Sequence, residues 1–221
     1  LLLPALPEFT RRYPLIELDL RLNDRIVDLV AERVDVALRV GPIRQAGLAA
    51  RRVSQVNIVT CAAPAYLQDH GEPKTPDELR EHKLVGLTSP SGAPPEWTFP
   101  PPYTPKRLGL KFSMLFNSAE APIIAATAGL GIAHTGDLLV AEYVGRGELK
   151  LILEDFVMPG PPISLVYPSA GHQLAKVRVF SDFAADLLLR WNEVVRRWIS
   201  QPPRPPVPAS ARLAQNPREP T

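Results

Sequence analysis

Apolar and polar positions in the first 41 residues follow two periods. Residues 2–9 carry leucine and phenylalanine at helical spacing, whereas residues 15–22 (LIELDLRL) alternate strictly. The first pattern predicts a short helix and the second a strand with one solvated face. A polar pair at 23–24 can cap a helix over 25–33, which leads into a strand over 34–41. Helix, strand, helix, strand in this order predicts an α/β fold with a parallel sheet.

The same reasoning extends to residue 199. Pro64 suits the first turn of a helix, and Thr75, Pro76 and Glu78 form the pattern of a capping box. Further strands are predicted over 51–61, 84–87, 97–99, 107–118, 132–134, 148–153 and 162–169, and further helices over 119–129, 138–146 and 174–199. Residues 201–221 are rich in proline without an apolar period, which predicts a disordered tail.

The stretch ATAGLGIAHTGDLLVAEYV, residues 126–144, carries a cluster of chemically informative positions. We expect Gly129 to end a helix in the left-handed conformation, and Gly131 to let the next strand approach that helix. His134 and Thr135 then emerge at the carboxyl end of the strand, where open α/β sheets bind ligands, and Asp137 caps the following helix. The stretch is interpreted as a pocket rim. The alternative is that His134 only bonds a neighbouring backbone carbonyl.

Several catalytic chemistries are excluded by missing motifs. The sequence AGLGIA lacks the third glycine of a dinucleotide fingerprint and follows a helix, and no phosphate-loop motif occurs. Ser118, His134 and Asp137 do not form a hydrolase pattern, because the nucleophile elbow is absent. Cys61 is interpreted as a buried bystander thiol. No catalytic residue, no metal site and no cofactor is therefore predicted, and the four histidines are too scattered for metal ligation.

Composition adds little to this picture. The chain has 221 residues with a formal net charge of +2, which is too small to indicate nucleic-acid binding by itself. A single cysteine fits a reducing compartment, so we expect a cytoplasmic location. No apolar run is long enough to span a bilayer, and the first residues do not resemble a secretory signal.

The ordered set of these segments resembles one protein family. LLPALPEFTRRYPLIELDLRLNDRIVDLVAERVDVALRVGPI is similar to the start of the effector-binding domain of LysR-type transcriptional regulators. ARRV, IVTCAAPAYLQDHGEPKTPDELREHKLVG, WTF, AATAGLGIAHTGDLLVAEYVGRGELKLIL, LVYPS and KVRVFSDFAADLL continue the resemblance in the same order. It extends from residue 1 to about residue 195.

The resemblance implies an α/β, type 2 periplasmic-binding-protein-like fold with two Rossmann-like subdomains and a cleft for a small-molecule inducer. Subdomain I would comprise residues 1–60 and 165–200, and subdomain II residues 62–163. Two crossover strands would join them, near Thr60–Ala62 and Ser164–Tyr167. Relatives associate as dimers of effector domains and as tetramers when full length. They bind DNA through an N-terminal winged helix-turn-helix.

The chain departs from this family pattern at its amino terminus. The DNA-binding module is absent, and so is the first strand, which would lie between strands 15–22 and 34–40. We therefore expect a fragment or a frame with a misassigned start. Relatives also tend to have an apolar residue and a proline where this chain has His134, Thr135 and Gly136.

The resemblance and the strand ends together give a set of candidate effector contacts. Arg39 could instead form a salt bridge with Asp35 or Asp19. The helix expected to begin at Ser118 offers free N–H groups to an anion. The predicted contacts are Arg39, Val40, Gly41, Thr60, Cys61, Ala62, Asn117, Ser118, His134 and Thr135.

The function implied is that of an effector-sensing domain of a bacterial transcription regulator, which binds a small, anionic organic inducer and is not an enzyme. The alternative is a solute-binding protein of a transport system with the same fold. By itself the chain is expected to self-associate, and not to bind DNA specifically or to contact a membrane.

Overall fold

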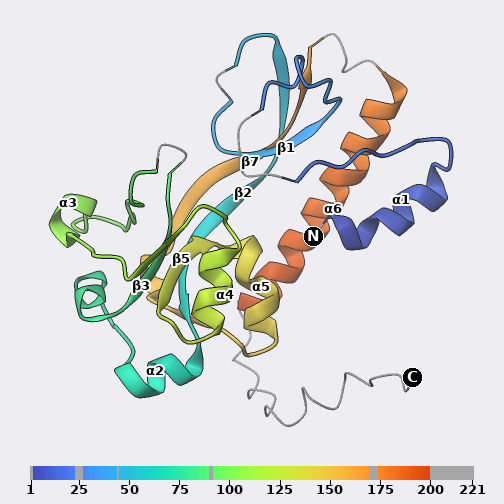
Figure 1. Cartoon of the computed structure of the whole chain (residues 1–221). Helices are drawn as coiled ribbons and strands as arrows, with labels where there is room; N and C mark the ends of the chain where they lie inside the picture. The colour runs from blue at the N-terminus through green and yellow to red at the C-terminus, as the bar shows by residue number, and fades with distance from the viewer. Residues whose placement is uncertain (1, 23–26, 44, 90–91, 170–173, 200–221) are drawn as a thin grey trace, which may run out of the picture. The chain divides into compact units, whose positions relative to one another are not determined.

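The computed structural model describes residues 2–22, 27–43, 45–89, 92–169 and 174–199, with the side chains of 196–199 excepted. This part of the chain falls into two compact units (Figure 1). Unit 1 takes residues from 1–58 and 159–196, and unit 2 comprises Val59–Met158. The limits that the resemblance implies, residues 1–60 and 165–200 for subdomain I and 62–163 for subdomain II, remain a prediction.

The sheet has the strand order β1-β7-β2-β5-β3-β4, with β6 paired to β2. In unit 2, β3 is parallel to both β4 and β5, with Val85 opposite Met114 and opposite Ala133. β6 runs antiparallel to β2, with Cys61 opposite Leu151. The strands are β1 (Ala37–Val40), β2 (Leu48–Ala62), β3 (Leu84–Leu87), β4 (Met114–Phe116), β5 (Ile132–Gly136), β6 (Lys150–Ile152) and β7 (Met158–Pro168).

Strand alternation gives unit 2 two apolar cores, one on each face of its sheet. Val85 and Ala133 lie in the core under α4 (Ala121–Thr127) and α5 (Asp137–Gly145). Leu84 and Ile132, one residue away on the same strands, lie in the opposite core. That face is covered by α2 (Pro64–His70), η2 (Pro76–Glu81), α3 (Pro105–Leu108) and the proline-rich residues 92–104, with η3 (Glu154–Phe156) after β6.

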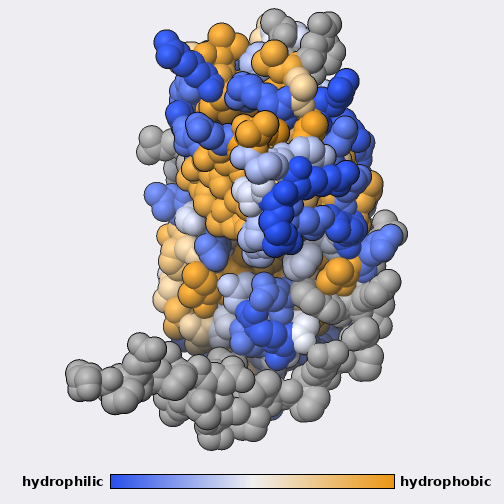
Figure 2. Space-filling view, turned by 90° about the vertical axis from the view of Figure 1, so that its right-hand side faces the viewer, coloured by the Kyte–Doolittle hydropathy of each residue, from blue (hydrophilic) through white to orange (hydrophobic). Residues whose placement is uncertain are grey.

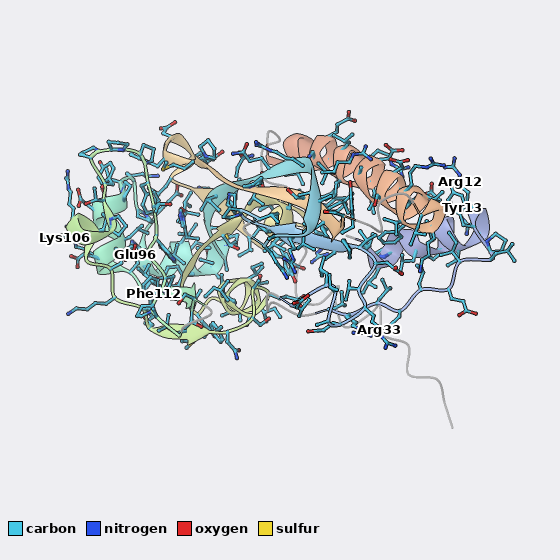
Figure 3. All side chains as sticks on the ribbon, turned by 90° about the horizontal axis from the view of Figure 1, so that it is seen from above. Arg12, Tyr13, Arg33, Glu96, Lys106 and Phe112 are labelled. Atoms are coloured by element: carbon cyan, nitrogen blue, oxygen red, sulfur yellow. The ribbon has the colours of Figure 1, made fainter. Side chains whose placement is uncertain are left out.

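Unit 1 contains α1 (Leu6–Arg12), most of α6 (Ala175–Ile199) and three strand segments, namely β1, most of β7 and the first part of β2. Helix α1, preceded by η1 (Leu3–Ala5), places Phe9 against Phe180 and Phe183 of α6. Figure 3 shows Arg12 and Tyr13 at the end of α1, where the guanidinium lies 5.4 Å from the ring centroid. The helix predicted over 174–199 is confirmed, and its buried side chains include Phe183, Leu188 and Val195.

The predicted strand over 15–22 is wrong. These residues form no ladder with any described strand, and Leu15 and Leu22 are 96% and 74% exposed. An alternating sequence becomes a strand only where a neighbour completes its backbone hydrogen bonds. The described part of 25–33 forms turns rather than a helix, with Asp28 accepting from the N–H groups of Val30 and Ala31. The strand expected over 34–41 forms as β1 and pairs antiparallel with β7, whereas the parallel part of the sheet lies in unit 2.

Three further local predictions need correction. Residues 97–99 form no strand, although Trp97 and Phe99 are buried, and only 114–116 of the strand expected over 107–118 forms. Gly129 does end α4 at φ 78°, but Gly131 permits a different close approach from the one expected. A Cβ at Gly131 would lie 2.5 Å from the carbonyl oxygen of Lys83, so its role is to bring β5 against the start of β3.

The predicted caps are partly formed. Gly136, not Asp137, is the N-cap of α5, and the Asp137 carboxylate accepts from the N–H of Leu138. Glu78 accepts from the Thr75 hydroxyl and from the Lys74 N–H, so its side chain reaches back as in a capping box. The predicted cap at 23–24 and the predicted disordered tail lie outside the described residues.

Candidate functional site

A side-chain hydrogen bond between two predicted site residues joins two strands of unit 2. Thr60 on β2 and His134 on β5 lie 2.9 Å apart between the hydroxyl oxygen and Nδ1. His134 shares the face of Ile132 because side chains two apart on a strand point the same way. Thr60 is buried, so its hydroxyl makes this bond away from solvent. The sequence predicted both residues, but not their bond.

Two aromatic side chains enclose the imidazole. The His134 ring lies 5.1 Å from Trp97 and 4.7 Å from Phe99, measured between ring centroids. Nε2 is shielded from solvent and has no hydrogen-bond partner of good geometry among the described residues. Burial lowers the pKa of His134 to about 4, although the backbone of Thr98 acts weakly in the other direction. His134 is therefore a neutral imidazole near pH 7.

The two residues that follow Thr60 on β2 are closed to solvent. Cys61 and Ala62 are fully buried. Burial raises the pKa of the Cys61 thiol to about 12, so it remains protonated and unreactive at neutral pH. In this arrangement neither side chain offers a polar group to a ligand.

The predicted anion site at Ser118 is not formed. α4 begins at Ala121 rather than Ser118, and Pro122 removes one of its first N–H groups. Asn117 and Ser118 are exposed residues before the helix. Thr135, next to His134 on β5, is half-buried.

The unit 1 residues of the predicted site follow one another at the end of β1. Arg39 stands opposite Ser164 and Val40 opposite Ile163, and the Gly41 N–H donates to the Pro162 carbonyl at 2.9 Å. The Arg39 guanidinium donates to the Val27 carbonyl and to the Gln45 side chain.

The salt bridges considered for Arg39 are not formed. Lys176 pairs with Asp35 at 2.7 Å, and Arg21 pairs with Asp19 at 3.0 Å. Among the described residues, Arg39 bonds neutral oxygens and has no carboxylate partner.

Trp97 and Phe99 belong to the surroundings of His134 but were not predicted there. Both come from a proline-rich segment without a regular spacing of apolar residues. Only their aromatic character could have indicated that they are buried. Phe112 contacts Trp97 edge-on at 5.4 Å, and Figure 3 labels it together with Glu96.

The described residues show neither a metal-binding cluster nor a membrane-spanning helix. No group of three or more histidine, cysteine, aspartate or glutamate side chains converges there as a metal-binding set. No helix in the described ranges has the length and apolar character to cross a membrane.

The sequence matches the family model of the LysR substrate binding domain over residues 1–189. It is 33% identical over 199 residues to the uncharacterized HTH-type transcriptional regulator YhjC of Escherichia coli, covering 85% of this chain and 63% of that protein. It is 32% identical over 191 residues to the HTH-type transcriptional regulator CrgA of Neisseria meningitidis serogroup C, covering 85% and 62%. The chain thus spans less than two thirds of the length of these relatives.

The fold is shared with solved regulatory domains. The regulatory domain of CrgA from Neisseria meningitidis superimposes with a TM-score of 0.71 at 28% identity, covering 85% of this chain and 92% of that one. The predicted type 2 periplasmic-binding-protein-like α/β fold is confirmed. With the family model matching most of its length, the chain belongs to the LysR substrate-binding domain family.

Proposed function

We propose that this chain is the effector-sensing domain of a LysR-type transcription regulator and binds a small organic anion as inducer. The match over residues 1–189 supports the domain assignment, and the named relatives are transcriptional regulators. A cytoplasmic location and action without enzymatic chemistry are part of the same proposal. Transport as a solute-binding protein is the less favoured alternative, because none of the relatives named above is a transporter.

Arg39 carries the anionic part of the proposal. Its guanidinium is half-buried and bonds neutral oxygens, with no carboxylate partner among the described residues. A partly desolvated cation without a counter-charge favours an anionic ligand, and a guanidinium can grip a carboxylate through two parallel bonds. In unit 2, Thr60, His134 and Thr135 provide the candidate neutral contacts. Val40, Gly41, Cys61, Ala62 and Asn117 are proposed to shape the surroundings, whereas Ser118 no longer has a helix terminus to offer.

The test is a ligand screen with a matched pair of variants. Thermal shift with a panel of small aromatic and aliphatic carboxylates, each with its neutral amide, identifies a ligand, and calorimetry then measures its Kd. We expect Arg39→Ala to weaken binding of the carboxylate by about tenfold to a hundredfold, because a charged hydrogen bond is worth about 1.5 to 3 kcal/mol. Arg12→Ala, which removes an arginine outside the predicted site, should leave Kd unchanged.

Two results would contradict the anionic ligand. Amides that bind as tightly as their carboxylates would remove the need for a cation. Arg39→Ala with an unchanged Kd would exclude this particular arginine.

The proposed partners follow from the family rather than from contacts seen here. We propose that full-length protein tetramerises and binds DNA through an N-terminal module, and that this chain alone lacks specific DNA binding. An electrophoretic shift with promoter DNA at physiological salt should show no specific complex for this chain. A nanomolar specific complex would contradict the proposal.

A further inference from the structure

Residues 94–99, here called the aromatic strap, cross one face of the unit 2 sheet without joining it. They form neither helix nor strand, and no backbone-to-backbone hydrogen bond is found for them within the described ranges. Pro94 and Pro95 have no N–H to donate. The strap therefore lies on the sheet mainly through its side chains, and the Thr98 backbone lies beside His134.

Those side chains make contact at three places. Trp97 lies edge-on to Phe112 at 5.4 Å. At Gly86 of β3, a Cβ would lie 2.7 Å from a Pro95 side-chain atom, so the strap sits directly on the strand there. On the next strand, Trp97 and Phe99 enclose the imidazole of His134. His134 is the titratable group in this contact.

The contact is made for an uncharged imidazole. Nδ1 bonds the Thr60 hydroxyl, the Nε2 atom is shielded from solvent without a hydrogen bond of good geometry among the described residues, and two aromatic rings cover part of the half-buried imidazole. The Thr98 backbone favours the charged form, but less than burial disfavours it. A charged imidazolium would need a hydrogen-bond acceptor at Nε2 and a counter-charge. With the strap displaced, water could accept a hydrogen bond from Nε2 and solvate the positive charge.

Glu96 on the strap is exposed, and no ionised side chain among the described residues shifts the pKa of His134. Burial and the smaller opposing effect of the Thr98 backbone account for the lowered pKa of His134, without a contribution from any ionised side chain. The titratable groups on or beside the strands and loops around it are Cys61, Lys83, Glu96, Lys111, Asp137 and Lys150.

We propose that the aromatic strap is a proton-linked cover, which closes over neutral His134 and is released when His134 is protonated. This device belongs to unit 2 alone and does not depend on the proposed inducer. Release would expose the Thr60–His134 pair at the carboxyl end of β5.

The direction and size of the effect follow from linkage. The pKa of His134 is about 4 in the closed form and near the ordinary 6.5 once solvated, so the open form binds the proton more tightly. The free energy that favours the closed strap over the open strap is greatest above pH 6.5. It decreases progressively as the pH falls toward 4, because the open form takes up the proton more readily. Between about pH 7.5 and about pH 5.5 the ratio of closed to open strap should fall about tenfold.

Fluorine NMR of protein labelled with 5-fluorotryptophan tests the proposal on the intact chain. The protein has three tryptophans, and Trp97→Phe identifies the signal of Trp97. We expect this signal alone to move toward its solvent-exposed position as the pH is lowered over that range. His134→Gln, which cannot titrate, should abolish the movement. His82→Gln, at a separate titratable contact with Tyr66, should leave it intact.

The proposal is overturned if the Trp97 signal stays fixed until the protein unfolds, or moves equally in His134→Gln. Should His134→Gln fail to fold, wild-type protein decides through the imidazole signals. The NMR signals of the His134 ring must then change with the same pH midpoint as the Trp97 signal. A different midpoint would contradict the proposed link between protonation of His134 and release of the strap.

Discussion

Residues 132–134 and residues 15–22 are both predicted strands, but only the first segment forms one. Residues 132–136 become β5, hydrogen-bonded to β3, with Ile132 and Ala133 buried on opposite faces. Residues 15–22 of unit 1 alternate more regularly but form no ladder among the described strands, and several of their leucines face solvent. The difference is the neighbour, since a strand is stabilised by partners that satisfy its backbone and cover its apolar face.

Large apolar side chains are exposed in both units, and those of unit 2 include Met114, Leu115 and Ile124. Figure 2 shows apolar side chains gathered in the upper part of the face it presents. In unit 1 the exposed apolar residues include Leu15, Leu22, Val30 and Val40. Unit 2 encloses its chemically interesting groups, such as Cys61 and the Nε2 of His134. If this difference is real, the core of unit 2 should be inaccessible to solvent and sensitive to substitution. Residues 15–22, which lack a neighbouring strand among the described residues, should tolerate substitution.

The largest expected effect is on the reactivity of Cys61. Because burial raises the thiol pKa from 9.0 to about 12, the thiolate population at pH 8 should be about a thousandfold lower than for a free thiol. As the only cysteine, it gives an unambiguous signal with a thiol-reactive disulfide dye. Native protein should resist labelling and urea-unfolded protein should react at once. Stoichiometric labelling of native protein within minutes would show that unit 2 opens readily.

A pair of glycine variants compares two positions in one turn of unit 2. Gly131→Ala places a Cβ 2.5 Å from a backbone oxygen, and it should lower the free energy of unfolding by about 3 kcal/mol. Gly129→Ala meets no atom within 4 Å but keeps φ at 78°, so about 1 kcal/mol is expected. Urea denaturation followed by circular dichroism measures both. Equal losses would mean that the approach of β5 to Lys83 is not tight.

Tyr66→Phe tests the hydrogen bonding of a buried hydroxyl in unit 2. The Tyr66 oxygen accepts from the Lys83 N–H at 2.9 Å and lies 3.3 Å from Nδ1 of His82. Its loss should reduce the free energy of unfolding by about 1 to 2 kcal/mol. Tyr13→Phe in unit 1 is the control, because its hydroxyl bonds no described residue, and it should change stability little. A loss as large for Tyr13→Phe would contradict the contrast between the units.

The smallest change in stability is expected where residues 15–22 are exposed. Replacing Leu15 and Leu22 with serine should alter the free energy of unfolding by less than about 0.5 kcal/mol each, because both side chains already face water. The same double variant should reduce the self-association proposed for this chain, measured by light scattering at tens of micromolar. Wild-type protein that is a stable monomer under these conditions would refute the association.

The sequence determined the elements whose signals are local. Pro64 opens α2, Gly129 ends α4, and the helical stripe of α6 is buried against Phe9 as its spacing indicates. These features depend on backbone geometry and side-chain period within one segment, so a single sequence suffices. The ordered set of segments was also enough for the family and its fold.

Only the tertiary structure decided which patterns found partners and how the polar groups met. It left 15–22 without a ladder and moved the start of α4 to Ala121. It joined Thr60 to His134 across 74 residues and enclosed the imidazole with Trp97 and Phe99 from a segment without period. Long-range contacts of this kind depend on which strands are neighbours, and the spacing of residues along one segment does not contain that information.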